Sequence, residues 1–444
     1  MPRRLDAQRP AAPRWAPSAI LVAATAAWAT AFGLVQLVRM RSGQPGYIDA
    51  LVYRAGGHAL LAGHPLYAPD FAAVNHSPGG LPFTYPPFAA LLFVPLAIVP
   101  AGAAIAALVV LNAAACAGLF GILLAAAHDR WDRLRGRRWL TAPTSARAAT
   151  VALAAAMVFA LSTPVQGNFT YGQLDLILAA AVAVDVLAPS TPWPRGLLVG
   201  LAAAVKLTPA VFIGYFLVTR QWRALAVSLG AAAFAVLAGW LVAPSDTVRY
   251  FTETAFDPAR IGQLRFASNQ SLRGVIERIP ALDPVRGPVA AGATLAVLAL
   301  AVVAIAVNRR SGDTVAALLS AAFIGLLCSP VSWGHHWLWL SAAAVYALTR
   351  WAAAGGAANL VAGVATAAVV LVPPWLFLPH DNGRERLWSG FEHLMGGAWA
   401  LTALALLAWF ATPRNLVSPP APDPPAPPRS PSWSVRSRRP ARRR

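Results

Sequence analysis

Charge is scarce in this sequence. Asp, Glu, Lys and Arg make up 12% of the 444 residues, whereas 57% are hydrophobic, and a soluble chain carries roughly 25% charged residues. The mean hydropathy is +0.56. Apolar stretches of about 17 to 25 residues, the length that a helix needs to cross a bilayer, recur along most of the chain. The composition excludes a soluble globular protein and indicates an integral membrane protein.

Cysteine is almost absent. Cys116 and Cys328 are the only two, and both lie inside apolar runs. A disulfide framework and a cysteine metal site both require more cysteines at closer spacing. We therefore expect both thiols to be small apolar packing residues.

The sequence also lacks the motifs that bind nucleotides. It has no P-loop, no glycine-rich dinucleotide fingerprint and no Asp-x-Asp pair. These are the elements that hold phosphates or a nucleotide-bound metal. Their absence argues against a nucleotide-sugar donor, and we expect neither a cofactor nor a metal.

What charge there is has mainly one sign. The formal net charge is +19, and the arginines cluster before residue 18, between Arg130 and Arg147, and from Arg414 onward. Cytoplasmic loops of membrane proteins carry such an excess and face anionic lipid headgroups. This distribution favours lipid over nucleic acid as the partner of the arginines. The single lysine, Lys206, and the abundant alanine suggest a high-GC, actinobacterial genome.

The order of apolar and polar segments predicts an all-α polytopic membrane protein. Residues 1–17 are a basic cytoplasmic N-terminus, residues 18–412 one membrane domain, and residues 413–444 a disordered cytoplasmic tail rich in proline and arginine. Ser18–Val38 is expected to be an uncleaved first span, followed by an extracytoplasmic loop over residues 39–82 with interfacial helices. The apolar runs give about 10–12 transmembrane helices by the twenty-residue rule. The topology parity and the oligomeric state stay open.

Six short segments carry the remaining polar residues. They are Asp49-x3-Tyr53 with Gly63-His-Pro-Leu-Tyr67, Phe83-Thr-Tyr-Pro-Pro-Phe88, Gly172-Gln-Leu-Asp175, Lys206-Leu-Thr-Pro209, Asn269-Gln-Ser-Leu-Arg-Gly274 and Ser329-Pro-Val-Ser-Trp-Gly-His-His336. In this order, the segments resemble the pattern of glycosyltransferase family 87, a family of polytopic enzymes of the GT-C class. The resemblance implies a GT-C-type fold, extracytoplasmic catalysis, a polyprenyl-phosphate-mannose donor and an α-1,2-mannosyl product.

Asp49 is the predicted general base. Attack on a β-linked mannosyl phosphate from the opposite face gives an α-mannoside in one displacement, which requires one base for the acceptor hydroxyl. An inverting transferase needs only one such carboxylate, unlike the paired acids of a hydrolase. The periodicity predicts an amphipathic helix over residues 49–62, so a helix-capping role for Asp49 is the alternative. Asp70 is the alternative base.

The leaving phosphate and the sugars require cations and hydrogen-bond donors. Lys206 is the first candidate, because an ammonium inside an apolar helix is costly and is usually paired or functional. His335 and His336 are predicted to contact sugar or phosphate rather than a shared metal. Further candidate binding residues are Tyr53, Arg54, His58, Gln173, Asn269, Gln270 and Arg273. Arg54 has snorkelling at the interface as its alternative, and residues 269–273 have a solvated loop.

The resemblance and the composition together predict mannose transfer to a cell-envelope glycolipid of the phosphatidylinositol mannoside or lipomannan type. A related enzyme that uses another lipid-linked sugar, such as arabinofuranose, is the first alternative. A lipid or ion transporter is the second. It would place acids and cations mid-bilayer in several helices and would show a repeat relating its halves. No repeat is evident in this sequence, and Asp49 is expected on a loop.

Overall fold

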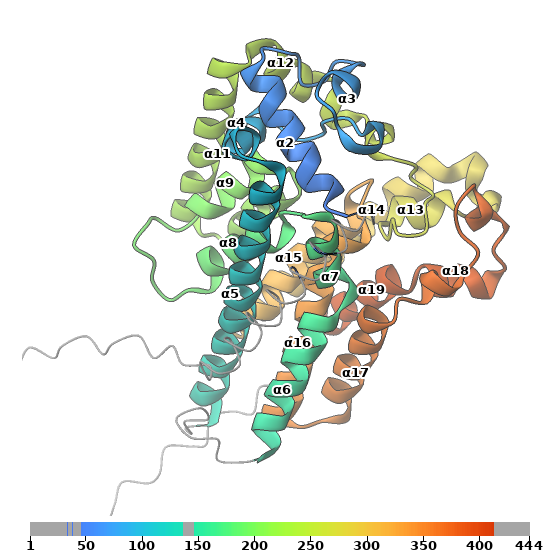
Figure 1. Ribbon diagram of the computed structural model, residues 1–444. Helices are drawn as coiled ribbons and strands as arrows, with labels where there is room; N and C mark the ends of the chain where they lie inside the picture. Colours follow the sequence, from blue (N-terminus) through green and yellow to red (C-terminus); the bar gives the residue numbers. More distant parts are fainter. Residues whose placement is uncertain (1–32, 34–37, 39–45, 136–145, 413–444) are drawn as a thin grey trace, which may run out of the picture.

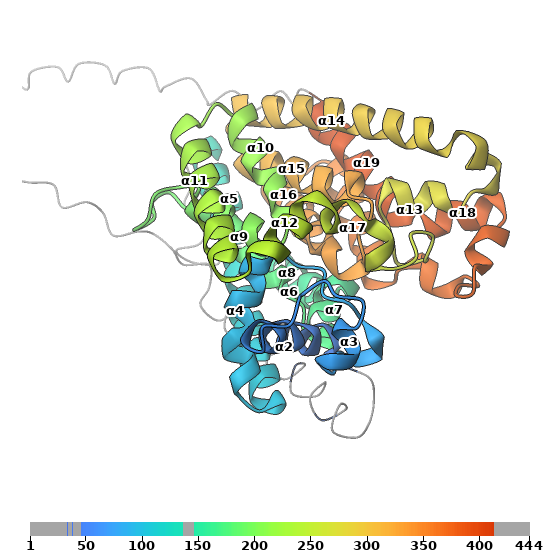
Figure 2. The same cartoon turned by 90° about the horizontal axis from the view of Figure 1, so that it is seen from above.

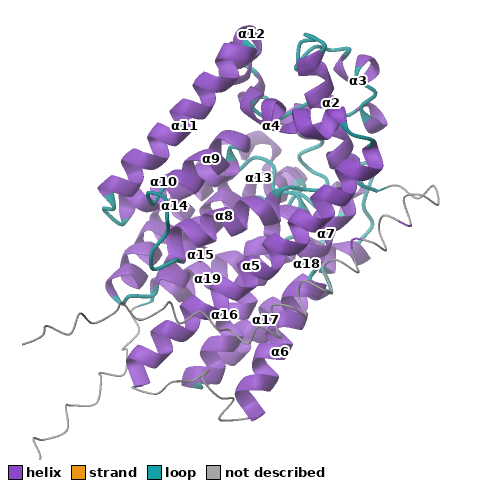
Figure 3. Cartoon of the chain, turned by 60° about the vertical axis from the view of Figure 1, so that its left-hand side comes forward, coloured by secondary structure: helices purple, strands orange, loops and turns teal. Residues whose placement is uncertain are grey.

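The structure is a computed structural model that describes residues 33, 38, 46–135 and 146–412. Throughout this part of the chain the regular elements are helices, and no strand occurs among them (Figure 3). The all-α prediction is confirmed. The predicted cytoplasmic N-terminus, most of the first span and the C-terminal tail lie outside the described residues.

The helices follow one another with short connections. They are α2 (Ile48–Leu61), α3 (Phe71–Val74), α4 (Pro87–Ile98), α5 (Ala101–Arg135), α6 (Ala146–Leu161), α7 (Thr163–Tyr171), α8 (Asp175–Leu187), α9 (Leu197–Val205), α10 (Val211–Val218), α11 (Trp222–Val242), α12 (Pro244–Thr252), α13 (Leu272–Glu277), α14 (Arg286–Arg310), α15 (Thr314–Cys328), α16 (Leu338–Ala354), α17 (Ala357–Leu371), α18 (Gly390–Gly396) and α19 (Ala398–Ala411). Three 3₁₀ turns matter for the site: η2 (Thr208–Ala210), η4 (Pro258–Ile261) and η6 (Gly334–Trp337).

Several of these helices are long and apolar enough to cross a membrane. They are Ala101–Ala126 of α5, Trp222–Val242 and Pro280–Arg310, and the bent pair of α18 and α19 makes a fourth if it is one span. Shorter apolar helices, among them Thr314–Cys328 and Ala357–Leu371, accompany them. The chain is a multi-pass membrane protein. The count of 10–12 spans stays a prediction, because length and composition qualify three or four helices in the described part.

Two of the apolar runs that the sequence suggests are broken in the structure. The run over residues 169–188 divides into α7 and α8 at Gly172, whose φ of 70° ends α7. The run over residues 196–218 divides at Lys206, which has an extended backbone (φ −146°, ψ 132°). Pro209 lacks an N–H and disfavours a helical conformation at the preceding residue, which accounts for the second break. Both breaks place polar residues at helix ends inside the molecule.

The core is a bundle of packed apolar helices. α16 lies at its centre and contacts α17, α6 and α5, and most of its side chains are buried. α14 packs along α15 and α19. In Figure 1, α2, α3 and α12 lie at one end of the molecule, while α5, α6 and α17 extend toward the other. Seen from above, α2, α3 and α4 project on one side and α14 runs along the opposite side (Figure 2).

The helix that carries Asp49 is anchored at its N-terminus. The backbone N–H of Tyr47 donates to the carbonyl of Thr170 (2.8 Å), and the hydroxyl of Tyr47 donates to the carbonyl of Gly33 (2.7 Å). Tyr47 is the N-cap residue, and no side chain caps the helix. The capping alternative for Asp49 is therefore wrong. Helix α2 begins one residue before the predicted position, packs against α4 and has Asp49 in its first turn.

Candidate active site

A cavity of about 480 Å³ lies where α2, the break after α9, the segment that follows α12 and the loop after α15 meet. Its polar and aromatic lining comes from all four parts. These lining residues include Asp49, Tyr85, Gln173, Lys206, Tyr250, Arg260, Trp333, His335 and His336. The predicted residues Asp49, Gln173, Lys206, His335 and His336, which are spread over nearly 290 positions of the sequence, thus share one cavity.

Asp49 lines this cavity from the first turn of α2. Burial raises the pKa of its carboxyl to about 6, while the side chain of Gln173 and the charge of Lys206 act in the opposite direction. The nearby carboxylate of Asp175 adds to the rise. A carboxylate with a pKa near neutrality can accept a proton from a hydroxyl and remains ionised at neutral pH.

Tyr53 lies one helical turn after Asp49 and is fully buried. Its hydroxyl donates to Oε1 of Gln173 (2.9 Å) and lies 3.0 Å from the hydroxyl of Tyr85. Its ring stacks on Phe93 of α4. Tyr53 therefore does not line the cavity but fixes Gln173 and Tyr85, which do.

Lys206 lies at the break between α9 and η2, and all its polar contacts are with other segments. Its Nζ is 2.6 Å from Oδ1 of Asp175, 3.5 Å from Oε1 of Gln173 and 3.2 Å from Nε2 of His336. The ion pair with Asp175 compensates for the burial of the ammonium among apolar helices. The break in the helix brings this cation to the cavity.

The tautomer of His336 follows from its backbone contact. The N–H of Trp333 donates to Nδ1 of His336 (3.2 Å), so Nδ1 is an acceptor. Burial holds the pKa of His336 well below its usual range, which keeps the ring neutral. A neutral ring with an accepting Nδ1 carries its proton on Nε2. Nε2 of His336 and Nζ of Lys206 are then two donors 3.2 Å apart, and one anionic oxygen between them would satisfy both.

His335 lies beside His336 with its ring perpendicular (centroids 4.4 Å apart). Its carbonyl accepts a hydrogen bond from Nδ2 of Asn168 (3.0 Å). Its Nε2 is buried without a hydrogen-bond partner and is 3.9 Å from Oδ2 of Asp175. Burial and the neighbouring His336 lower the pKa of His335 well below the usual value. His335 is therefore a neutral side chain with an unused nitrogen atom at the cavity wall.

Asp175, His335 and His336 have ligand atoms within 4.8 Å of one another, a spacing that a metal ion could use. Two features oppose that interpretation. The ammonium of Lys206 already supplies the positive charge at Asp175 (2.6 Å). Nε2 of His336 carries a proton and cannot ligate a metal in that state. Their chemistry suits hydrogen bonding to an anion better than metal binding.

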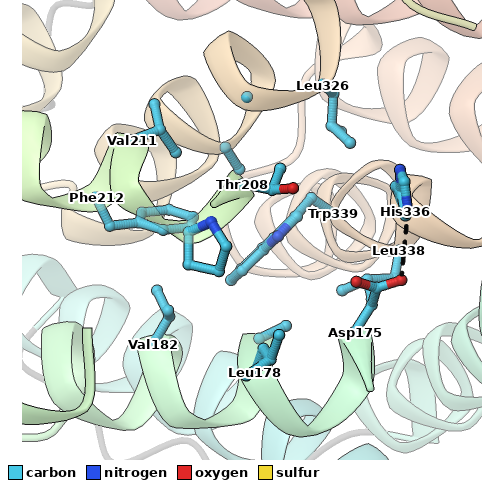
Figure 4. Close-up of a pocket in the computed structure, with 14 residues that line it drawn as sticks. Asp175, Leu178, Val182, Thr208, Val211, Phe212, Leu326, His336, Leu338 and Trp339 are labelled. Carbon is cyan, nitrogen blue, oxygen red and sulfur yellow. Dashed lines mark ion pairs between the residues drawn. The ribbon is translucent and has the colours of Figure 1, made fainter. Parts of the chain in front are cut away.

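A narrow apolar slot adjoins the main cavity at His336 (Figure 4). It holds about 40 Å³ between α8, η2 with α10, α15 and the start of α16. Leu178, Val182, Phe212 and Trp339 line it, and Asp175 lies at the end nearest His336 (Figure 4). A polar cavity is thus joined directly to an apolar one.

Two of the predicted binding residues on α2 lie away from the cavity. Nη2 of Arg54 donates to the carbonyls of Ala97 (3.3 Å) and Val99 (2.9 Å), where it satisfies the C-terminal end of α4. His58 does not line the cavity either. At about 100° per residue, offsets of five and nine positions turn Arg54 and His58 by about 140° and 180° from Asp49. The expectation that Arg54 shares an adjoining face with Asp49 is therefore wrong.

The residues predicted between Asn269 and Arg273 hold the loop after α15 rather than line the cavity. Nδ2 of Asn269 donates to the carbonyl of Pro330 (3.1 Å), and its Oδ1 accepts from the N–H of Ser332 (2.9 Å). Nε2 of Gln270 donates to the carbonyl of Gly396 (2.7 Å). Asn269 and Gln270 are fully buried, so the solvated-loop alternative is wrong for them. Arg273 forms an ion pair with Glu277 (2.7 Å).

Two further acids lie outside the cavity. The side chain of Asp70, the alternative base, is 62% exposed and lies 3.5 Å from His64. Asp185 accepts hydrogen bonds from the N–H groups of Gly196 (2.9 Å) and Val199 (3.1 Å) at the start of α9. The geometry agrees with a structural role for Asp185 and leaves Asp49 as the carboxylate next to Lys206 and the histidines.

Sequence reasoning assigned no role to four residues of the cavity wall: Tyr85, Tyr250, Arg260 and Trp333. Tyr85 belongs to the Phe83–Phe88 segment, and Trp333 precedes the histidine pair, so motif position was a usable signal for both. Tyr250 and Arg260 lie in a polar stretch without a motif, and only the fold brings them to the site.

The fold and the cavity together define a multi-pass membrane enzyme with a carboxylate, an ammonium and two imidazoles around one chamber. The model of glycosyltransferase family 87 matches residues 83–330, more than half of the chain. The chain belongs to glycosyltransferase family 87, and it is a glycosyltransferase.

Curated relatives cover most of the chain. It is 38% identical, over 89% of its own length and 91% of the relative's, to a polyprenol-phosphate-mannose-dependent α-(1-2)-phosphatidylinositol mannoside mannosyltransferase of Mycolicibacterium smegmatis. A protein of the same description from Mycobacterium tuberculosis is 36% identical over 82% of this chain and 84% of its own. A pentamannoside mannosyltransferase of Mycolicibacterium smegmatis is 33% identical over 83% and 86%. No solved structure matches the chain significantly.

Proposed function

We propose that this protein transfers mannose from polyprenyl-phosphate mannose to a glycolipid of the phosphatidylinositol mannoside or lipomannan type. The product is an α-1,2 linkage. Mannosyltransferases of that donor and linkage share 36–38% of their residues with the chain over more than four fifths of its length. The observation that carries the proposal is the cavity that joins Asp49 to Lys206 and His336.

The step is a single displacement at the anomeric carbon of mannose. Asp49 accepts the proton of the acceptor hydroxyl, whose oxygen forms the new bond to C1 from the face opposite the phosphate. The bond between C1 and the phosphate oxygen breaks, and its electron pair stays on the phosphate. The β-linked donor thus gives an α-linked product, with one carboxylate as base.

The polyprenyl phosphate that leaves gains negative charge as the bond breaks. Nζ of Lys206 and the protonated Nε2 of His336 are donors 3.2 Å apart at the cavity wall, and an oxygen of this phosphate would accept from both. Such donors stabilise the transition state more than the ground state, because the charge develops during the step. The adjoining apolar slot suits a hydrocarbon portion of the donor.

We also propose that the cavity opens to the extracytoplasmic side. The short basic segments at Arg220–Arg223 and Arg309–Arg310 lie at the ends of α10 and α14 that are remote from α12 and α13. The positive-inside bias assigns such ends to the cytoplasm. A lipid-linked donor is the kind of substrate that is available on the other side of the membrane.

The test is a transfer assay with membranes from an expression host that does not make mannosylated phosphatidylinositol. Polyprenyl-phosphate mannose and, separately, GDP-mannose are supplied with labelled mannose and a phosphatidylinositol mannoside acceptor. We expect label in the glycolipid only with the polyprenyl donor, and its release by an α-1,2-specific mannosidase. Label from polyprenyl-phosphate arabinofuranose alone would instead establish the alternative sugar.

A further inference from the structure

Arg260 is a cation of the cavity wall to which the reaction described above gives no role. It lies on η4, in the segment that joins α12 to α13. Its guanidinium lies 5.8 Å from the ring centroid of Tyr67, and Nη2 and Nε of Arg260 are buried without hydrogen-bond partners. Unpaired buried donors are costly, so this pair of nitrogen atoms indicates an acceptor that the chain itself does not supply.

The acids near Arg260 are engaged elsewhere. The carboxylate of Asp257 accepts from the N–H of Ala259 (3.1 Å) and caps η4. Glu253 pairs with Arg249 (3.4 Å). None of the ion pairs found in the described ranges includes Arg260, whereas Lys206 is paired with Asp175. Arg260 is thus a cavity cation whose charge is not balanced by a neighbouring carboxylate.

The surroundings of Arg260 suit the headgroup of a lipid. Ile261, which also lines the cavity, and Phe256, on the same segment, are 43% and 77% exposed. An arginine beside exposed apolar side chains can bind a phosphate while hydrocarbon covers its neighbours. Gly262 follows with a φ of 141°, and a Cβ there would lie 3.0 Å from the ring of Trp333. The turn that carries Arg260 is therefore packed closely against the cavity wall.

Arg260 and Lys206 lie at separate parts of one wall. Lys206 is 5.8 Å from the ring centroid of Tyr85, and the hydroxyl of Tyr67, below Arg260, donates to the carbonyl of Tyr85 (2.6 Å). A tyrosine pair thus separates the two cations. The proposed reaction brings two anionic lipids together, a polyprenyl phosphate and a phosphatidylinositol derivative, so two phosphate sites are required.

We infer that Arg260 binds the phosphodiester of the acceptor lipid and so positions its sugar toward Asp49. This inference rests on the proposed function, which assigns the phosphate of the donor to Lys206 and His336. The planar fork of arginine binds two phosphate oxygens at once, which a lysine cannot reproduce. Arg260 is then a specificity-determining residue that distinguishes a phosphatidyl lipid from a neutral glycolipid.

The test combines binding and kinetics on the purified full-length protein. Native mass spectrometry gives the affinity for phosphatidylinositol, for diacylglycerol and for polyprenyl phosphate, with wild type, Arg260→Gln, Arg260→Lys and Arg249→Gln. We expect Arg260→Gln to weaken phosphatidylinositol binding by about 10-fold to 100-fold, the usual effect of losing a charge-assisted pair of hydrogen bonds. Arg260→Lys should lie between, because it keeps the charge but not the fork.

The other lipids and the matched variant serve as controls. Arg249→Gln removes an arginine of the same segment that pairs with Glu253, and it should bind phosphatidylinositol as wild type does. Diacylglycerol and polyprenyl phosphate should bind all variants alike. In the transfer assay, Arg260→Gln should raise KM for the acceptor by a similar factor and leave KM for the donor unchanged.

The outcomes separate this inference from the proposed function. Unchanged affinity for phosphatidylinositol in Arg260→Gln overturns the inference, even if the wild type transfers mannose. A loss confined to polyprenyl phosphate overturns the acceptor assignment and makes Arg260 a donor ligand. A wild type that transfers no mannose contradicts the proposed function, while the binding comparison still decides the role of Arg260. The melting temperature of each variant, equal to that of the wild type, excludes misfolding as the cause.

Discussion

At the scale of single residues, the site depends on a carboxylate and a cation that burial would otherwise penalise. Asp49 is held near Gln173 and Lys206, and Lys206 is held by Asp175. Each of the four lies on a different segment, so none is stabilised by its own helix alone. A polar network of this kind is stable only when each member keeps its partner.

The raised pKa of Asp49 predicts an acid limb in the pH profile of kcat/KM. The base acts only when it is ionised, so activity is present above its pKa of about 6 and falls as the pH drops through that value. At one unit below, about a tenth of the plateau rate remains. Gln173→Leu removes an interaction that lowers this pKa, and the limb should move to higher pH. An acid limb near pH 4, the value of an ordinary carboxylate, would contradict the assignment.

Residue types and motifs predicted much of the site. Asp49, Gln173, Lys206, His335 and His336 were all expected, and all five line the cavity. The arginines were harder to predict. Arg54 and Arg273 have the right charge, but their partners are carbonyls of α4 and Glu277. Arg260 was not expected, because the direction of a side chain depends on contacts that a linear pattern does not contain.

At the scale of elements, the breaks between helices matter more for the site than the helices themselves. Lys206 lies at the end of α9, Gln173 between α7 and α8, and His336 in the 3₁₀ turn before α16. The sequence predicted helix α2 to within a residue at each end. The break at Gly172 was not predicted, because apolar residues continue on both sides of it and periodicity does not register a left-handed residue.

Gly172 provides a test of how an element positions the base. It has a φ of 70°, and a Cβ at this position would lie 2.6 Å from Cβ of Ala50, next to Asp49. Gly172→Ala adds about 1 kcal/mol of backbone strain and must also push α2 away. We expect a loss of at least about tenfold in kcat with a smaller change in KM, because a shift of about 1 Å can cost about 100-fold.

The matched control is Gly118→Ala in α5. A Cβ there meets no atom within 4 Å, and alanine is the better helix former by about 1 kcal/mol. Gly118→Ala should therefore keep wild-type kcat and an equal or higher melting temperature. Equal activity in Gly172→Ala and Gly118→Ala would show that the close contact between Gly172 and Ala50 does not position Asp49.

At the scale of the whole molecule, composition determined the class of protein and the structure shows how the helices share its core. Low charge and recurring apolar runs predicted a polytopic helical protein, and that prediction is confirmed. Several of the observed apolar helices, such as Thr314–Cys328, are shorter than a full span. Counting windows of about twenty residues therefore cannot give the number of crossings. The single membrane domain over residues 18–412 stays a prediction.

The orientation of the molecule can be tested by labelling introduced cysteines. His76, on the loop after α3, and Arg310, at the end of α14, are both exposed. In a background with Cys116→Ala and Cys328→Ala, a membrane-impermeant maleimide should label His76→Cys in intact cells. Arg310→Cys should be labelled only after the cells are lysed. The reverse pattern would place the cavity on the cytoplasmic side and contradict extracytoplasmic catalysis.

The measurement that tests the central claim most directly is mannose transfer from labelled polyprenyl-phosphate mannose by wild type, Asp49→Asn and Asp70→Asn in matched membranes. Loss of a general base lowers the rate by about 100-fold to 10,000-fold. The account predicts such a loss for Asp49→Asn at normal expression, and wild-type transfer for Asp70→Asn, whose carboxylate is exposed and outside the cavity. Wild-type transfer by Asp49→Asn would contradict the account, because no other step in it removes the proton of the acceptor.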